Sequence, residues 1–348
     1  MRKLLVIVGP TASGKTQLGI DLAKRFDGEV VSVDSRQVYR GMDVGTGKIK
    51  GEKLEIGNWK LGKGLPMALV VDGVPHWGID LVEPDAEYSV ADFKKYAEEK
   101  IVEISKRGKL PILVGGTGLW VRAVVDDLNL TETARNDELR DRLEARHLDD
   151  LFAEYKRLDP DGAELIDRQN KRRVVRALEV TIATGKPFSA QLKRGTSKYD
   201  LLEIGILVDR DVLNERINDR VEVMVATGLV DEVRRLHESY GCDVESMTGI
   251  GYRQICHWIC GEGSGSWGRR NRTPVARSEA SAETARTIGC SAAGAPGTGT
   301  LAEAIEETKK ATRAYAKRQM TWFRRDDRVR WIERSEEALE IAGAWVTR

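Results

Sequence analysis

A phosphate-binding loop that directly follows a short apolar run is the feature that most constrains how this chain folds. Leu4–Val8 is apolar, and the next eight residues, Gly9–Thr16 (GPTASGKT), match the pattern G-x-x-x-x-G-K-[ST]. A strand, this loop and a helix in sequence point backbone N–H groups and the positive end of a helix dipole at an anion. The alternative is a glycine-rich turn with an exposed lysine, but the apolar run before the loop and the amphipathic pattern after it favour a phosphate site.

The residue types within the loop suit separate tasks. Gly9 and Gly14 let the backbone curl inward, Lys15 adds a mobile positive charge, and the Thr16 hydroxyl is suited to hold Mg²⁺. We therefore expect Thr16 to hold Mg²⁺ and a phosphate compound to bind at the following residues: Gly9, Pro10, Thr11, Ala12, Ser13, Gly14, Lys15 and Thr16.

Alternating strand and helix patterns follow the loop. A helical pattern closed by Gly28 precedes a strand at Val30–Asp34, and further strands are predicted at Leu69–Val71 and Leu110–Val114. The last of these leads into Gly115–Gly118 (GGTG), which predicts a close approach of two backbones. The pattern predicts an α/β fold with a P-loop NTPase-like parallel sheet flanked by helices. Because ligands bind at the carboxyl ends of such strands, we expect Asp34 to lie near the phosphates.

A run of charged helices interrupts the strand patterns between about residues 129 and 200. Helices are predicted at Glu138–His147, Asp149–Leu158 and Arg172–Thr184, and Gly185 ends the last of them. Strand and helix patterns then resume, including a long basic helix at Leu301–Phe323. We therefore predict a core formed by residues 1–128 and 200–348, with residues 129–199 as a small inserted all-helical lobe.

Residues 261–300 have a different composition from the rest of the chain. They are rich in Gly, Ser, Ala, Thr and Arg and lack an apolar period, which predicts a flexible insertion. Nucleic-acid binding by Arg269, Arg270 and Arg272 is the alternative to a plain linker, and composition favours the linker.

Positive charge is concentrated in two stretches, although the formal net charge is only +1. One stretch runs from Arg168 to Arg176 and the other from Lys309 to Arg330. Two local basic faces suit the binding of a polyanion, and two solvated helix faces are the alternative that charge alone leaves open.

The cysteines and the lack of long apolar segments bear on location. Four cysteines without a regular disulfide spacing suit a reducing cytoplasm, and no segment approaches the length of a membrane span. The opening apolar run is too short for a signal peptide. Cys256 and Cys260, with His257 between them, could suggest a metal site, but a pair of thiols one helical turn apart is more simply explained by packing.

Seven blocks together resemble the tRNA dimethylallyltransferases, also called tRNA isopentenyl transferases. The resemblance covers nearly the whole chain except about residues 261–300, which that family does not usually carry. The blocks are the phosphate loop, the Asp34–Gln37 segment (DSRQ), the GGTGL strand end, RVVRALEV at Arg173–Val180 with its GKP turn, GLVDEVRRL at Gly228–Leu236, GIGYRQ at Gly249–Gln254, and TRAYAKRQMTWFRR at Thr312–Arg325.

The resemblance implies transfer of a dimethylallyl group from dimethylallyl diphosphate to the exocyclic amine of the adenosine 3′ to the anticodon of tRNA. Asp34 would be the general base, with a role as a magnesium partner as its alternative. Thr117 and Arg220 would assist at the diphosphate and the reacting centre, although Arg220 alone looks like a surface arginine on a helix. Lys15, the loop amides and Mg²⁺ on Thr16 would stabilise the leaving diphosphate.

The same resemblance implies contacts with the tRNA anticodon stem-loop. They would come from Asp34, Ser35, Arg36, Gln37, Thr117, Arg140, Arg172, Arg173 and Arg176. The target base would leave its stack to reach the pocket. Two residues depart from the family pattern: Trp120 stands where Tyr is common, and Arg36 adds charge at the variable position of the DSRQ segment.

Three other functions use parts of the same pattern. A P-loop kinase or other NTPase needs a second, acidic motif. This chain shows no obvious carboxylate for it, because the strand before Gly115 ends in Gly-Gly. A prenyltransferase of free adenine nucleotides does not need the basic lobe and the basic C-terminal helix. A non-catalytic RNA-binding protein would not need Lys15, Thr16, Asp34 and Thr117. We therefore expect a cytoplasmic, monomeric, Mg²⁺-dependent tRNA prenyltransferase without membrane contact.

Overall fold

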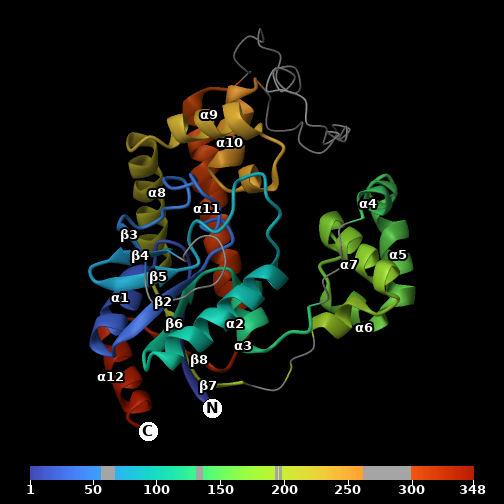
Figure 1. The fold of residues 1–348 in the computed structure, drawn as a ribbon. Helices are drawn as coiled ribbons and strands as arrows, with labels where there is room; N and C mark the ends of the chain where they lie inside the picture. The colour runs from blue at the N-terminus through green and yellow to red at the C-terminus, as the bar shows by residue number, and fades with distance from the viewer. Residues whose placement is uncertain (56–66, 131–135, 193–194, 196–197, 262–298) are drawn as a thin grey trace. The chain divides into compact units, whose positions relative to one another are not determined.

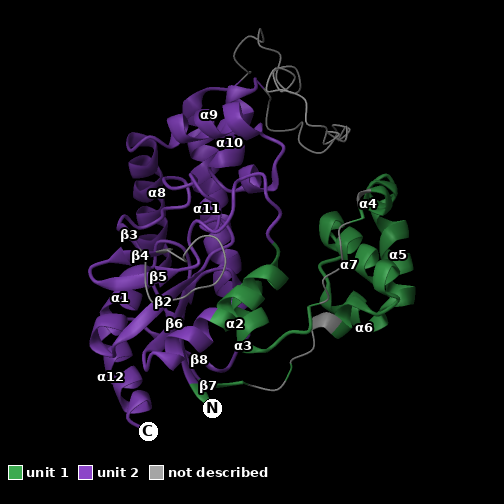
Figure 2. Cartoon of the chain, in the orientation of Figure 1, with its two compact units in different colours: residues 1–2, 89–99, 119–200 green, residues 3–88, 100–118, 201–348 purple. Residues whose placement is uncertain are grey.

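The computed structural model describes residues 1–55, 67–130, 136–192, 195, 198–261 and 299–348. They form two compact units (Figure 2), one of residues 1–2, 89–99 and 119–200, and the other of residues 3–88, 100–118 and 201–348. We call them the lobe unit and the core unit. Most of the predicted insertion, residues 262–298, lies outside the described residues, so its flexibility and the RNA role of its arginines stay predictions.

An eight-stranded sheet forms the centre of the core unit (Figure 1), in the order β3-β4-β5-β2-β6-β1-β7-β8. The strands are β1 (Arg2–Val8), β2 (Gly28–Val33), β3 (Glu52–Glu55), β4 (Met67–Val71), β5 (Val74–Trp77), β6 (Leu110–Gly115), β7 (Tyr199–Ile206) and β8 (Val329–Ile332). Every residue of β2 and of β6 is buried, as expected for strands covered on both faces.

The sheet is mixed, whereas the sequence predicted a parallel one. β2 pairs in parallel with β5 and β6, β1 with β6, and β7 with β8. β3, β4 and β5 pair antiparallel and form one edge of the sheet. β4 and β5 are joined by a two-residue turn in which Asp72 and Gly73 both have positive φ. Of these three strands, the sequence predicted only Leu69–Val71, which is part of β4. β3 and β5 have four residues each and are too short to show an alternating apolar pattern.

Helices flank the sheet of the core unit, as the P-loop NTPase-like fold requires. The helices of the core unit include α1 (Lys15–Arg25), α2 (Val90–Lys106, whose first half belongs to the lobe unit), α8 (Arg210–Ala226), α9 (Leu229–Tyr240), α10 (Tyr252–Ile259), α11 (Leu301–Phe323) and α12 (Ser335–Val346). Of these, α9 packs on α8, and α10 packs on α9 and α11. Apolar side chains of β1, α1, β6 and α12 share one buried cluster. Thr300 caps α11 in a reciprocal bond with Glu303, and α11 has the predicted bounds.

The lobe unit is helical. It contains α3 (Gly118–Val125, from Leu119 on), α4 (Asp137–Glu144), α5 (Leu148–Leu158), α6 (Pro160–Leu165), α7 (Lys171–Thr184) and the 3₁₀ helix η1 (Phe188–Leu192). Leu151, Tyr155, Val174 and Leu178 lie in a core that α4–α7 share. Gly185, with φ 66°, ends α7 as predicted, whereas α3 and α6 were not predicted. The boundaries of the insertion lobe, 129–199, stay a prediction.

One helix end differs from its prediction. Gly28 was expected to close the helix after the phosphate loop, but α1 is capped at Phe26 and Gly28 is the first residue of β2. A Cβ on Gly28 would lie 2.8 Å from the carbonyl oxygen of Leu110, so glycine is required there by close strand packing rather than by helix termination.

Candidate functional site

A cavity of about 570 Å³ opens over the phosphate loop in the core unit. Its wall comes from segments far apart in the sequence: the loop, the end of β2, the end of β6, α8 and α11. The candidate residues among its lining are Thr11, Ala12, Ser13, Gly14, Lys15, Thr16, Asp34, Gln37 and Arg220. The structure therefore gathers residues between positions 11 and 220 around one cavity.

The phosphate loop has the curled backbone that its glycines predict. Gly9 and Gly14 have φ values of 149° and 91°, and the Lys15 ammonium donates to the carbonyl oxygen of Pro10 at 2.5 Å. The Ser13 hydroxyl is buried and has no hydrogen-bond partner among the described residues. Such a buried hydroxyl in a phosphate loop indicates a position where a ligand oxygen binds.

Gln319 of α11 fixes the loop to the end of β6. Its side chain accepts a hydrogen bond from the Thr11 backbone N–H at 2.9 Å and donates to the carbonyl oxygen of Gly116 at 3.0 Å. A Cβ on Gly116 would lie 2.1 Å from the Gln319 amide nitrogen, and one on Gly118 would lie 2.2 Å from the Trp322 ring. A Cβ on Gly115 would lie 2.1 Å from the carbonyl oxygen of Val33, so the close backbone approach predicted at the GGTG segment is to β2, while side chains of α11 cover Gly116 and Gly118.

Asp34 follows the last residue of β2, at the carboxyl edge of the sheet. Its carboxylate accepts a hydrogen bond from the Arg36 backbone N–H at 2.8 Å, which fixes one oxygen. Thr117 lies beside this turn, because its hydroxyl accepts from the Ser35 backbone N–H at 3.2 Å. Two of the three predicted catalytic residues, Asp34 and Thr117, thus lie at one edge of the sheet.

Lys15 and Arg220 are partly buried cations in the cavity lining, and both lie near the Asp34 carboxylate. Burial and the nearby Arg220 guanidinium lower the pKa of Lys15 to about 7, although Asp34 acts in the opposite direction. Burial also lowers the pKa of Arg220, and Asp34 again opposes the shift. Neither cation makes an ion pair within 4 Å among the described residues, so the cavity carries positive charge that an anion can neutralise.

Tyr315, one turn before Gln319 on α11, was missed by sequence reading as a residue of the site. Burial and then the charge of Asp34 raise the pKa of Tyr315 to about 12, and its hydroxyl bonds to Thr117. The phenol therefore stays protonated beside Asp34 and Thr117 at neutral pH. The available signal was the i, i+4 spacing of Tyr315 and Gln319 within a helix described only as basic.

The residues after Asp34 make bonds within the protein. The Arg36 guanidinium donates to the carbonyl oxygens of Glu245 and Ser246 at 2.7 and 3.3 Å and to the Thr248 hydroxyl at 3.0 Å. The Gln37 amide accepts from the Ser32 hydroxyl at 2.9 Å and donates to the carbonyl oxygen of Thr46 at 3.3 Å. In the structure, Arg36 ties two segments together, and the predicted tRNA contacts of Ser35, Arg36 and Gln37 stay predictions.

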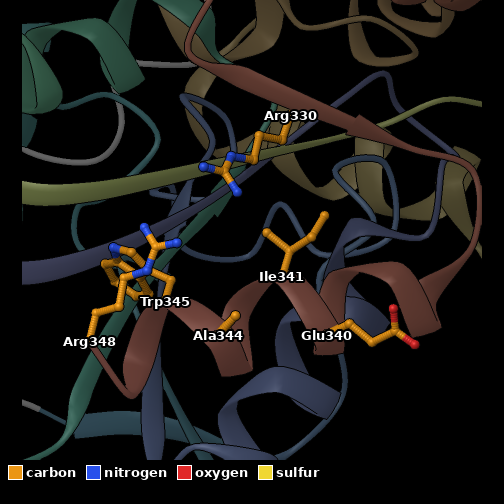
Figure 3. A pocket seen from close by; sticks show the side chains of 6 residues that line it. All are labelled: Arg330, Glu340, Ile341, Ala344, Trp345 and Arg348. Atoms are coloured by element: carbon orange, nitrogen blue, oxygen red, sulfur yellow. The ribbon is translucent and has the colours of Figure 1, made fainter.

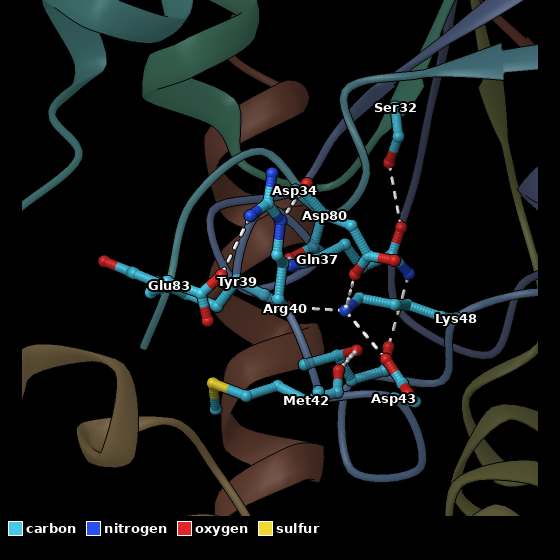
Figure 4. Close-up of polar contacts among 12 residues, drawn as sticks. Ser32, Asp34, Gln37, Tyr39, Arg40, Met42, Asp43, Lys48, Asp80 and Glu83 are labelled. Atoms are coloured by element: carbon cyan, nitrogen blue, oxygen red, sulfur yellow. Dashed lines mark hydrogen bonds and ion pairs between the residues drawn. The ribbon is translucent and has the colours of Figure 1, made fainter. Parts of the chain in front are cut away.

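A network of charges holds the loop that follows this segment (Figure 4). The Lys48 ammonium contacts the Tyr39 carbonyl oxygen and the carboxylates of Asp43 and Asp80, the last two at 2.9 and 2.5 Å. Although burial raises it, hydrogen bonds from Lys48 and Lys53 hold the pKa of Asp80 below its ordinary value. Asp80 therefore stays ionised and anchors the loop at neutral pH.

Glu232 holds the same loop from α9. Its carboxylate accepts from the backbone N–H groups of Asp43, Val44 and Gly45 at 2.8–3.0 Å and from the Tyr252 hydroxyl at 2.5 Å. These contacts give the GLVDEV and GIGYRQ blocks a structural role, because one supplies the carboxylate and the other the tyrosine. A Cβ on Gly45 would lie 2.6 Å from the Tyr252 ring.

In the lobe unit, the predicted tRNA-binding arginines fall into two classes. Arg140 and Arg176 contact the fully buried Glu179 carboxylate at 2.7 and 3.0 Å. Arg172 and Arg173 are exposed in the first turn of α7, and their side chains have no hydrogen-bond or ion-pair partner among the described residues. Cations at a helix N-terminus are unfavourable by themselves, which makes this turn suited to an anion.

Trp120, the departure at a usual tyrosine, packs within the lobe unit. Its ring stacks on Phe93 with centroids 4.5 Å apart and planes 25° apart, and only 6% of the residue is exposed. Trp120 therefore contributes a buried aromatic contact.

The donors at the cavity fit Mg²⁺. Thr16 offers an exposed hydroxyl at the start of α1 and Asp34 offers a carboxylate in the same cavity, and both are the hard oxygen ligands that Mg²⁺ prefers. A second hollow, of about 290 Å³, lies beside β8 and α12 (Figure 3), with a lining that includes Arg330, Trp345 and Arg348 but no candidate site residue. No helix in the described part of the chain is long and apolar enough to cross a membrane.

Comparisons with known proteins agree on one family. A family model described as IPP transferase matches residues 37–326, and another described as Isopentenyl transferase matches residues 2–58. The tRNA dimethylallyltransferase of Anoxybacillus flavithermus is 37% identical over 339 residues, covering 97% of this chain and 92% of the relative. That of Carboxydothermus hydrogenoformans is 38% identical over 345 residues, covering 97% and 94%.

Solved structures give the same result. A tRNA isopentenylpyrophosphate transferase from Bacillus halodurans superposes with a TM-score of 0.64 at 37% identity, covering 100% of this chain and 98% of that one. A eukaryotic dimethylallyltransferase described as acting on tRNA superposes with a TM-score of 0.64 at 27% identity, covering 92% of this chain and 70% of that one.

Proposed function

The chain belongs to the IPP transferase family, and from this premise we propose that it transfers a dimethylallyl group from dimethylallyl diphosphate to tRNA. The acceptor is the exocyclic amine of the adenosine 3′ to the anticodon, and diphosphate is the leaving group. Supporting this proposal is the presence of a carboxylate and two partly desolvated cations in one cavity over the phosphate loop.

The loop residues bind the diphosphate. Its oxygens occupy the positions that the loop N–H groups and the Ser13 hydroxyl face, and Lys15 and Arg220 supply compensating charge. Negative charge on the diphosphate grows as the allylic carbon–oxygen bond breaks, so these groups bind the transition state more strongly than the substrate. Thr16 and Asp34 would hold Mg²⁺, which would supply further positive charge to the leaving group.

Asp34 accepts the proton of the attacking amine. An aryl amine is a weak nucleophile that gains positive charge as it bonds to the allylic carbon, and a carboxylate within reach removes its proton. The turn at Arg36 fixes one oxygen of Asp34, and Thr117 and the protonated Tyr315 stand beside it. The alternative is that Asp34 serves only as a magnesium partner. The roles of general base and magnesium partner differ in the pH dependence of turnover that they produce.

The tRNA contributes its base to the cavity and its backbone to the lobe unit. Reaching a cavity over a phosphate loop requires the target base to leave its stack. Arg172 and Arg173 are exposed at the positive end of α7 and suit phosphate contacts of the anticodon stem. Arg140 and Arg176 support them indirectly by pairing with Glu179. We propose a monomeric enzyme that works in the cytoplasm.

An acceptor competition tests this function. The protein is incubated with dimethylallyl diphosphate, Mg²⁺ and either unmodified tRNA or AMP, and nucleosides are then analysed by mass spectrometry. Prenylated adenosine from tRNA alone is expected. Prenylated AMP with unmodified tRNA would instead assign the free-nucleotide activity, and phosphate release from ATP without prenylation would assign a kinase or ATPase.

A further inference from the structure

Arg220 reaches the substrate cavity from α8 without a polar partner. Its guanidinium lines the cavity but makes no hydrogen bond and no ion pair within 4 Å among the described residues. An arginine side chain is long and can adopt many rotamers, so its position must be fixed before it can hold an anion well. Packing against neighbouring atoms is therefore what places this guanidinium.

Gly47, in the segment between β2 and β3, packs against this guanidinium. A Cβ added to Gly47 would lie 1.9 Å from Nη2 and 2.8 Å from Cζ of Arg220. It would also lie 3.3 Å from Cε of Met224, which follows Arg220 by one turn of α8. Because no side chain fits at this position, Arg220 packs directly on the backbone of Gly47.

The backbone of Gly47 is held in turn by Glu232 of α9. The Glu232 carboxylate is only 6% exposed and accepts hydrogen bonds from the N–H groups of Asp43, Val44 and Gly45 at 2.8–3.0 Å. The Gly47 N–H then donates to the carbonyl oxygen of Val44 at 3.0 Å. Hydrogen bonds to an ionised carboxylate are among the stronger ones in proteins, so this turn has a firm anchor.

Two further contacts fix the same turn. The Tyr252 hydroxyl donates to the Glu232 carboxylate at 2.5 Å, and burial and then the charge of Glu232 raise the pKa of Tyr252 well above its ordinary value. The hydroxyl therefore keeps its proton and stays a donor. On the other side of the turn, the Gln37 amide donates to the carbonyl oxygen of Thr46 at 3.3 Å.

We propose that Glu232 is a positioning residue, which holds the Arg220 guanidinium in the cavity through the backbone of residues 43–47. The inference rests on the proposed function, in which Arg220 binds the diphosphate. Without the carboxylate, three backbone N–H groups lose their acceptor, the turn shifts and Gly47 no longer fixes the guanidinium. Glu232 itself does not line the cavity, so it acts on the reaction only through the turn.

Alanine at position 47 tests the contact with Arg220. Gly47→Ala should lower turnover about 100-fold, since a misplacement of about 1 Å can cost that much, while filter binding of tRNA stays nearly unchanged. Calorimetric affinity for inorganic diphosphate should fall about 10–100-fold. Gly108→Ala is the matched control and should change none of these values. Gly47 and Gly108 have φ values of 62° and 76°, but an added Cβ on Gly108 meets no non-adjacent residue within 4 Å. Equal diphosphate affinity in the two variants would overturn the inference.

A double-mutant cycle tests whether Glu232 acts through Arg220. Glu232→Gln should weaken diphosphate binding about tenfold, because an amide nitrogen cannot accept the N–H bonds of the turn. In the Arg220→Ala background the same change should have almost no further effect, since the guanidinium that it positions is gone. Additive losses would mean that Glu232 only supports the fold, and would reject the proposal. If Glu232→Gln does not fold, Tyr252→Phe removes one donor to the carboxylate and should show the same non-additivity at smaller size.

Diphosphate binding also separates this inference from the proposed reaction. A wild-type chain that binds diphosphate but does not prenylate tRNA would reject the reaction, while the affinities of Gly47→Ala and Gly108→Ala would still decide how Arg220 is positioned. A wild-type chain that binds no diphosphate would overturn the inference, because Arg220 would then have no such anion to bind.

Discussion

The substrate cavity and the lobe unit treat positive charge in opposite ways. In the cavity, Lys15 and Arg220 are partly desolvated, and one carboxylate, Asp34, faces the two of them. In the lobe unit, Arg140 and Arg176 share the buried Glu179 carboxylate in close contacts. The cavity thus keeps uncompensated charge for a ligand, while the lobe uses part of its charge to hold its own helices together.

This difference shows why counting basic residues is a poor guide to binding. The stretch from Arg168 to Arg176 looks uniform in the sequence, yet Arg176 is held by Glu179 while Arg172 and Arg173 are exposed. Four substitutions or conditions test the comparison.

The largest effect is expected at Asp34. Asp34→Asn removes the proton acceptor but keeps the turn that its side chain caps, so turnover should fall about 10²–10⁴-fold with little change in tRNA affinity. Single-turnover kinetics and filter binding measure the two. Asp72→Asn is the matched control, because Asp72 also lines the cavity but pairs with the exposed Lys24. Equal losses in both variants would show that Asp34 acts only through the charge of the cavity.

In the lobe unit, the buried carboxylate of Glu179 should affect the stability of the fold rather than turnover. Glu179→Gln leaves Arg140 and Arg176 without their anion, and because both arginines are partly exposed we expect a loss of about 2–3 kcal/mol. Thermal unfolding and hydrogen exchange of α4 and α7 measure it, with the exposed Glu138→Gln as control. Unchanged exchange in Glu179→Gln would mean that the lobe does not depend on this cluster.

The lowered pKa of Lys15 predicts a pH-dependent affinity for diphosphate. Below about pH 7 the free protein already carries the ammonium, whereas above it binding must take up a proton. The affinity should therefore fall as pH rises, by up to about tenfold per pH unit. The Lys15→Arg variant stays charged at every pH and serves as the reference. Because diphosphate itself titrates equally in both experiments, the difference between the two proteins reports Lys15 alone. Parallel pH profiles for the two proteins would contradict a lowered pKa.

The smallest effects are expected at the exposed arginines. Arg172→Ala and Arg173→Ala should weaken tRNA binding modestly and each reduce the slope of affinity against salt by about 0.7–1, with turnover at saturating tRNA unchanged. Arg176→Ala should instead behave like a mild form of the Glu179 variant. A salt slope that changes for Arg176 but not for Arg172 would reverse the assignment of the two classes.

Local patterns were sufficient for the elements that begin the site. The phosphate loop, the strand that ends at Asp34 and the helix at Leu301–Phe323 could be predicted, because each depends on residues close in sequence. β3 and β5 could not, since they are short and become strands by pairing with β4 and β2.

Contacts between distant segments were beyond such patterns. Gln319 contacts Thr11 across 308 residues, and nothing near either residue signals the bond. The disulfide between Cys242 and Cys256 was missed for the same reason, because the segment between α9 and α10 brings these two cysteines together. The pairing of Arg176 with Glu179, by contrast, follows from i, i+3 spacing on one helix.

The bridge that Gln319 makes also has a consequence for synthesis of the protein. The phosphate loop leaves the ribosome well before the side chain that links it to Gly116, because Gln319 is translated 308 residues after Thr11. During most of translation, the nascent chain therefore carries a phosphate loop without its final support. The loop gains this support only when α11 has been made and has packed, which makes completion of the proposed diphosphate site a late event in the production of each molecule.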